Sequence, residues 1–134
     1  PGNLAVSFAH RVGIEVMPLV GASSILMALM ASGMNGQSFV FHGYLPIKQP
    51  QRIKKLQEIE KDALKKQQTQ IFMEAPYRNN QLLETILKSC HPKTSLCIAS
   101  NITASDQFIQ TKTILNWKKE IPDLHKKATM FLLA

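Results

Sequence analysis

Apolar and polar positions alternate in short blocks along the chain, and their spacing predicts alternating strands and helices. The clearest block is residues 71–80, where the apolar run 71–73 meets a carboxylate at Glu74 and then Pro76. Apolar residues at helical spacing follow, namely Leu82, Leu83, Ile86, Leu87 and Cys90. This order predicts a buried strand, a tight turn and a helix, with Pro76 in the first helical turn. Ligands of open α/β sheets collect at the carboxyl ends of strands, so this turn is either a ligand site or an ordinary connection with a solvated Arg78.

The pattern over residues 4–45 predicts two helices and two strands. A short helix is expected over residues 4–12, ended by Gly13, followed by a strand over residues 14–19. A second helix is expected over residues 24–32, capped by Ser23 or Ser24, and a strand over residues 39–45. The second helix is apolar on most sides, which predicts burial, in part against another domain or subunit; its apolar residues are Ile25, Leu26, Met27, Leu29 and Met30.

A strongly basic segment lies between the two predicted strands at 39–45 and 71–73. Residues 47–50 read as a loop and residues 52–66 as an amphipathic helix, whose apolar face is Ile53, Leu56, Ile59, Ala63 and Leu64. From position 48 to 66 there are seven basic and three acidic residues, so seven minus three gives a net charge of +4. Such a helix is either a solvated surface or a ridge that contacts phosphates.

The remaining blocks complete an α/β pattern. Strands are expected over residues 96–99, 107–113 and 129–133, the second of them an antiparallel edge strand, with a loop over 100–106 and a helix over 114–121. Alternating strands and helices indicate an α/β fold with a mixed sheet. Three turns then become candidate ligand sites, at residues 21–24, 73–78 and 99–103. No phosphate-binding loop or dinucleotide-binding glycine motif occurs.

Composition narrows the class of protein and of partner. The 134 residues carry 45% hydrophobic residues, which suffices for one domain with a core. The apolar run 25–31 is too short to span a bilayer, and four scattered histidines give no metal-ligand spacing. Two cysteines indicate core thiols of a reducing, cytoplasmic compartment. The net charge of +7 favours a polyanionic partner, nucleic acid first, although it also serves solubility.

Residues 16–24, VMPLVGASS, are similar to the V-P-L-P-G-P-S-A/S segment of the tetrapyrrole methylase family, the class III S-adenosylmethionine-dependent methyltransferases. This segment is the first of four ordered motifs that resemble the family. Residues 31–33 and 39–46, ASG and FVFHGYLP, resemble the A-S-G…F-x-F-x-G-F-L-P run of its ribosomal RNA branch, which methylates a cytidine ribose 2′-oxygen. Residues 74–78, EAPYR, resemble E-S/A-P-H-R, and Pro1-Gly2 resembles the end of S-D-P-G.

The chain departs from the family pattern at three places. Val20 and Ala22 stand where the family has prolines, which predicts a less rigid loop. Tyr77 replaces the usual His. Residues 99–103, ASNIT, lack the charges of the R-E-L-T-K segment of the ribosomal branch, and their N-I-T is closer to the E-N-G-T of porphyrin methylases. These departures bear on the acceptor, which the sequence does not identify.

The resemblance implies a domain arrangement and a set of partners. Family members have two α/β domains with the cofactor in the cleft between them. Residues 1–20 would then be the last helix and strand of an N-terminal domain, and residues 21–134 the C-terminal domain. The implied cofactor is S-adenosyl-L-methionine and the implied partners are small-subunit ribosomal RNA and the rest of the same protein. Class III members are generally dimers, so a homodimer is expected, with no membrane association.

The resemblance also implies site residues. The adenosine pocket would be walled by Met73, Glu74, Asn101, Ile102, Ala128 and Thr129. RNA contacts are expected at Lys48, Arg52, Lys54, Lys55 and Arg78. No catalytic residue and no metal site are assigned, because a base could come from either domain. Two other functions remain open: a corrin or porphyrin C-methyltransferase of the same family, and a non-catalytic basic binding module with this fold.

Overall fold

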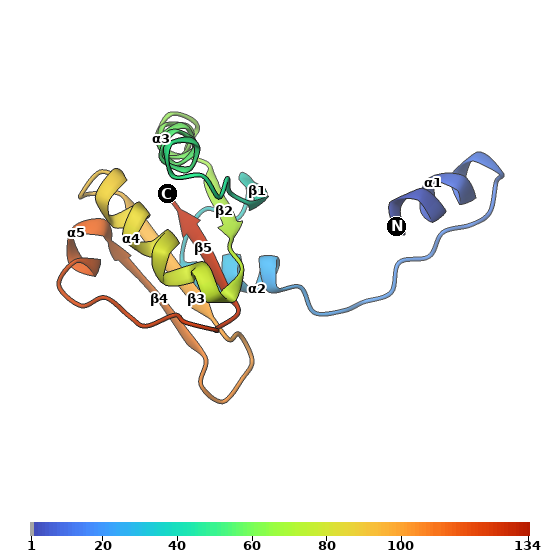
Figure 1. Cartoon of the computed structure of the whole chain (residues 1–134). Coiled ribbons are helices and arrows are strands. Elements are labelled where there is room, and N and C mark those ends of the chain that lie inside the picture. The colour runs from blue at the N-terminus through green and yellow to red at the C-terminus, as the bar shows by residue number, and fades with distance from the viewer. Residues whose placement is uncertain (1) are drawn as a thin grey trace.

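The computed structural model describes residues 2–134. Pro1, the first residue of the predicted Pro1-Gly2 motif, lies outside the described residues. Helix α1 (Gly2–Arg11) ends just before Gly13, which takes a left-handed φ of +74°. Residues 14–23 then run to the sheet domain without regular structure, and α1 lies apart from that domain (Figure 1). The predicted first helix is confirmed. The predicted strand over residues 14–19 is wrong, because a strand needs a neighbour and no part of residues 2–134 pairs with it.

A mixed sheet forms the centre of the fold and confirms the predicted α/β class. Its strands stand in the order β1-β2-β5-β3-β4. β1 pairs parallel with β2, and the other three pairings are antiparallel. β4 is an edge strand, as predicted. The bounds are β1 (Phe39–Tyr44), β2 (Thr69–Met73), β3 (Ser95–Ser100), β4 (Phe108–Thr113) and β5 (Thr129–Leu133).

These pairings fix where the strand ends meet. Because β5 runs antiparallel to both β2 and β3, the strands β1, β2 and β3 all point the same way. Their carboxyl ends therefore lie at the edge of the sheet where β5 begins (Figure 1). Residues that are far apart in sequence, around positions 74, 101 and 128, are brought to this one edge.

Helices cover both faces of the sheet. The larger core holds Phe72, Ile98 and Phe131 on the face covered by α3 (Gln49–Lys66), α4 (Asn79–Ser89) and α5 (Ile114–Trp117). The next residues along the strands, such as Ile71 and Cys97, point to the opposite face and pack with α2 (Ser24–Ser32). This alternation is the period of two that a strand imposes. The free thiols Cys90 and Cys97 are both buried.

The bounds of α3 and α5 differ most from the sequence prediction. α3 begins at Gln49 rather than Arg52, because Pro50 lies in the first turn, where a helix does not need its N–H. The buried stripe of α3 runs through Arg52, Leu56, Ile59 and Ala63, so Leu64 lies beside the stripe and its side chain is exposed. α5 ends at Trp117, four residues before the predicted end at 121.

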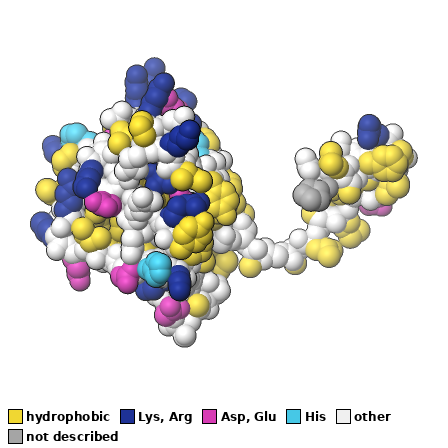
Figure 2. Space-filling model, in the orientation of Figure 1, with side chains coloured by type: hydrophobic (Ala, Val, Ile, Leu, Met, Phe, Trp, Pro, Cys, Tyr) yellow, Lys and Arg dark blue, Asp and Glu magenta, His cyan; other side chains and the backbone are white. Residues whose placement is uncertain are grey.

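Helix α2 has the predicted bounds but only a narrow buried stripe. Ser23 caps it by accepting from the backbone N–H of Leu26 at 3.5 Å, and Gly33 ends it with φ +72°. Ala28 and Leu29 are buried, whereas Met30 is 78% exposed. Figure 2 shows further hydrophobic side chains on α1 and on the side of the sheet domain from which the segment to α1 departs. Within residues 2–134, no helix is long and apolar enough to cross a membrane.

Candidate functional site

A hollow of about 450 Å³ lies at the edge of the sheet where β1, β2 and β3 end and β5 begins. All three turns that the sequence singled out contribute to it: Ser24 from the first, Met73 and Glu74 from the second, Asn101 and Ile102 from the third. Its volume is in the range of about 300–1,000 Å³ that small-molecule sites occupy. The other lining residues are Tyr44, Pro76, Ala99, Ala104, Ala128, Thr129 and Met130.

The six residues expected to wall an adenosine pocket all line this hollow. Met73 and Ile102 supply apolar surface and are half-buried, while Thr129 and Glu74 are buried. The structure thus brings together residues that lie on three separate strand ends. Their contact with a cofactor stays a prediction.

Asn101 holds the third turn against the start of β5. It has a left-handed φ of 47°, a conformation that Asn tolerates better than most residues. Its backbone N–H donates to the carbonyl of Ala128 at 2.8 Å, and its side-chain Oδ1 accepts from the N–H of Ala128 at 3.1 Å. Its Nδ2 donates to Asp106 at 2.8 Å. This reciprocal pairing fixes two walls of the hollow relative to each other.

Asn79 holds the loop before β5 in place, and the sequence analysis did not identify this residue. Its buried Nδ2 donates to the carbonyl of Lys127 at 2.6 Å and to that of Leu124 at 3.3 Å. The backbone N–H of Lys126 adds a bond to the carbonyl of Pro76 at 3.1 Å. The sequence feature that could have identified Asn79 is its position: it lies three residues before Leu82, and helical spacing puts it on the same buried face.

Glu74 is the most constrained side chain of the site. Its Oε2 accepts from Arg52 Nη2 at 2.7 Å, and its Oε1 accepts from Arg78 Nη2 at 2.9 Å and from the N–H of Ala75 at 2.7 Å. The hydrogen bond to Glu74 raises the pKa of Arg78. Both carboxylate oxygens are therefore engaged, which disfavours Glu74 as a free general base.

The expected RNA contacts are not all on one surface. Arg52 is fully buried and paired with Glu74, so it does not belong to an exposed ridge as the sequence suggested. The cause is its place on the apolar stripe of α3, where only an ion pair makes a charge tolerable. Lys48 and Lys54 are exposed, and Lys55 lies 3.8 Å from Glu58. Arg78 is partly exposed beside the hollow.

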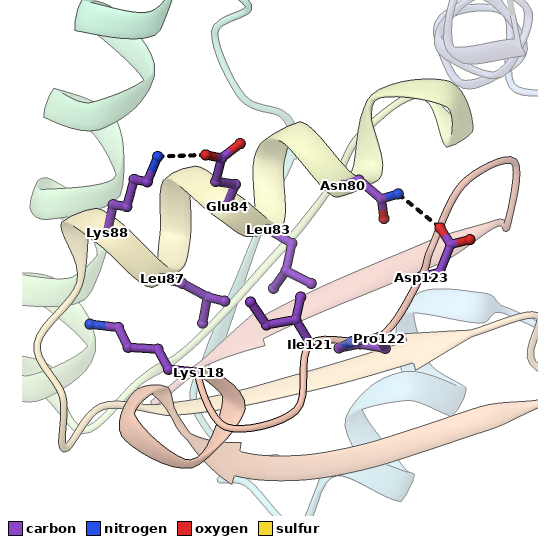
Figure 3. Close-up of a pocket in the computed structure, with 9 residues that line it drawn as sticks. All are labelled: Asn80, Leu83, Glu84, Leu87, Lys88, Lys118, Ile121, Pro122 and Asp123. Atoms are coloured by element: carbon purple, nitrogen blue, oxygen red, sulfur yellow. Dashed lines mark hydrogen bonds and ion pairs between the residues drawn. The ribbon is translucent and has the colours of Figure 1, made fainter.

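A larger hollow of about 820 Å³ lies elsewhere, between α4 and the loop before β5 (Figure 3). Its floor is apolar, formed by Leu83, Leu87 and Ile121. Most polar groups at its rim are used in local contacts: Asn80 Nδ2 donates to Asp123 Oδ1 at 2.8 Å, which lowers the pKa of Asp123, and Lys88 pairs with Glu84. Lys118 also lines the groove but makes no such side-chain contact among residues 2–134, and the groove lies away from the predicted site residues.

Among residues 2–134 no cluster of three or more His, Cys, Asp or Glu residues could hold a metal ion.

No protein-family model matches the chain. It is 34% identical over 136 residues to the ribosomal RNA small subunit methyltransferase I of Vibrio cholerae serotype O1, an alignment that covers 99% of this chain and 46% of that protein. The chain thus spans about half the length of the curated relatives it matches.

Solved structures share the fold at low sequence identity. The methyltransferase CobJ has a TM-score of 0.57 and 18% identity, over 98% of this chain and 56% of that one. A uroporphyrin-III C-methyltransferase from Thermus thermophilus, complexed with S-adenosyl homocysteine, has a TM-score of 0.50 and 14% identity, over 99% and 58% of the two chains. The resemblance to the tetrapyrrole methylase family is therefore confirmed, and the chain is similar to ribosomal RNA small subunit methyltransferase I.

Proposed function

We propose that this chain is the half of an S-adenosylmethionine-dependent methyltransferase that supplies one wall of the cofactor cleft, and that the complete enzyme methylates small-subunit ribosomal RNA at a ribose 2′-oxygen. The observation that carries the proposal is the convergence of Met73, Glu74, Asn101, Ile102, Ala128 and Thr129 on one hollow. The methyltransferase from Thermus thermophilus adds support, because that similarly folded protein is complexed with S-adenosyl homocysteine. The name of the Vibrio relative supports an RNA acceptor.

The hollow has the chemistry that the adenosine part of the cofactor requires. Met73, Ile102 and Met130 offer apolar surface to a flat base, and Asn101 and Thr129 add polar atoms at its edge. When bound, S-adenosylmethionine supplies a methyl group on a sulfonium; transfer breaks the C–S bond, forms the new C–O bond and releases the hydroxyl proton. The donor is already activated, so the task left to the protein is alignment and removal of that proton.

The domain arrangement is part of the proposal. Residues 1–20 belong to an N-terminal methylase domain, and residues 21–134 form the C-terminal domain. The exposed apolar residues of α1 and of the following segment, such as Leu4, Phe8 and Met17, support a further packing surface for them. Met30 and Leu26 of α2 support a second such surface, which we assign to a homodimer contact. The protein is expected to work in the cytoplasm.

The test is methyl transfer by the complete protein. The purified protein is incubated with methyl-labelled S-adenosylmethionine and small ribosomal subunits, and the RNA is digested to nucleosides. The proposal expects label in a 2′-O-methylated nucleoside. Label on a porphyrin or corrin in a parallel incubation, with no label in the RNA, would favour the C-methyltransferase, and absence of cofactor binding by the complete protein would favour a non-catalytic module.

A further inference from the structure

A second hollow of about 550 Å³ adjoins the predicted cofactor hollow. It lies between the turn after β1, residues 44–47, and the turn after β2, where Glu74, Ala75 and Arg78 line it. Tyr44 and Glu74 line both hollows, so the two share a wall. A group bound in one therefore lies next to a group bound in the other.

The charge of this second hollow is positive although a carboxylate lies in its wall. Among the residues that line it, Glu74 contributes one negative charge and Arg78 one positive charge; Arg52 does not line the hollow, but it is fully buried against Glu74 and adds a second positive charge. The carboxylate is saturated with donors, and the buried Nε of Arg78 has no hydrogen-bond partner among residues 2–134. The exposed Lys48 follows the same turn. Excess donors and excess positive charge together favour an anionic ligand.

Exposed aromatic and apolar surface surrounds this positive centre. The side chains of Tyr44 and Ile47 are each 63% exposed. Tyr77 is also 63% exposed, and the guanidinium of Arg78 lies over its ring at 4.8 Å. Exposed rings beside guanidinium groups are the means by which proteins hold unstacked bases and their phosphates. A pocket for a small inorganic anion alone would not need the aromatic surface.

We propose that this second hollow binds the acceptor nucleotide of an RNA chain, with a phosphate at Arg78 and the base against Tyr44. The proposal rests on the proposed function and adds to it the place of the acceptor. The sugar of a nucleotide held in this way lies at the wall shared with the cofactor hollow. Arg52 does not touch RNA; it is a positioning residue that acts through Glu74 to hold Arg78.

The test uses the complete protein and two independent variants. Tyr44→Ala removes an exposed ring whose hydroxyl makes no hydrogen bond within residues 2–134, so the fold is expected to survive. Arg78→Gln removes the anchoring charge. Lys88→Gln, at an exposed pair with Glu84 on α4, is the matched control. We measure the KM for small-subunit RNA, the affinity for a single-stranded RNA oligonucleotide and the affinity for S-adenosylhomocysteine.

Both variants should weaken oligonucleotide affinity and raise the RNA KM by about tenfold or more, because base stacking and a phosphate contact are lost. Arg78 does not line the cofactor hollow, so affinity of Arg78→Gln for S-adenosylhomocysteine should stay within about twofold, and Arg78→Lys should recover part of the RNA affinity. Tyr44 lines both hollows, so the test for Tyr44→Ala is that its loss of RNA affinity exceeds any loss of affinity for S-adenosylhomocysteine. The proposal is overturned if folded Tyr44→Ala keeps wild-type affinity for the oligonucleotide. Binding of a porphyrin carboxylate that both variants abolish, with RNA affinity unchanged, would also overturn it.

Failure of this proposal is distinguishable from failure of the proposed function. If the wild-type protein transfers methyl groups to RNA while Tyr44→Ala and Arg78→Gln leave KM unchanged, only the acceptor site is wrong. If the wild-type protein binds the oligonucleotide through these residues but does not bind S-adenosylhomocysteine, the acceptor site stands and the methyltransferase assignment fails.

Discussion

Arg52 and Glu74 form an ion pair that is almost completely buried, with Nη2 and Oε2 2.7 Å apart and the side chains 0% and 1% exposed. Arg52 Nε also donates to the carbonyl of Pro46 at 2.9 Å. The pair therefore ties α3 and the turn after β1 to the turn after β2. Its Glu74 lines both hollows, so the pair holds in place the wall that the hollows share.

Glu74→Gln should destabilise the fold by about 3–5 kcal/mol, because it leaves the buried Arg52 guanidinium without its countercharge. Chemical denaturation measures this change. Glu84→Gln, which removes one partner of an exposed pair on α4, is the control and should change stability by less than about 1 kcal/mol. A Glu74→Gln protein with wild-type stability but no methyl transfer would instead make Glu74 a catalytic base.

Lys54 and Lys55 should contact RNA phosphates through the exposed face of α3. Reversing both charges to Glu is expected to weaken RNA binding across all sequences and to reduce the slope of log K against log salt by roughly one to two units. Filter binding over a salt series gives both quantities. If neither the affinity nor the slope changes, the lysines are only solvated.

The two cysteines should be unreactive in the folded protein. Burial raises the pKa of the Cys90 thiol to about 12, and burial also raises that of Cys97. At pH 8 a thiol reagent should therefore modify them only after denaturant is added. Because the folded pKa of Cys90 exceeds that of an unfolded thiol, near 8.5, its contribution to stability is complete below that pH and is lost as pH rises toward 12. Rapid modification under native conditions would contradict this burial.

Residues 1–134 alone should bind S-adenosylmethionine weakly or not at all. Ala128 is exposed and Met73, Asn101 and Ile102 are only half-buried, so the cofactor hollow is open to solvent. A site that leaves much of its ligand solvated has little apolar burial to offset the cost of binding. Isothermal titration calorimetry tests this expectation, and a micromolar dissociation constant would show that this half of the cleft is sufficient.

The sequence pattern predicted three candidate turns, and the family resemblance added Ala128 and Thr129 at the start of the last strand; all of them contribute to the hollow. Each predicted pocket residue lies at an end of a strand, so the register of the sheet brings Glu74, Asn101 and Ala128 to one edge, while their contact with a cofactor stays a prediction. The burial of Arg52 could not be predicted, since a basic residue at the start of a basic helix reads as solvated until its partner, 22 positions away, is known. The strand predicted at 14–19 failed because local apolar pattern does not supply a pairing partner.

The most direct test of the cofactor site is the affinity of the complete protein for S-adenosylhomocysteine after Ala128→Trp. The new ring would occupy the hollow at the start of β5, and Leu115→Trp, at an exposed position on α5, is the control. We expect Ala128→Trp to weaken binding by at least about tenfold with the melting temperature maintained, while the control binds as wild type. Wild-type affinity in the folded Ala128→Trp protein would show that the cofactor binds elsewhere.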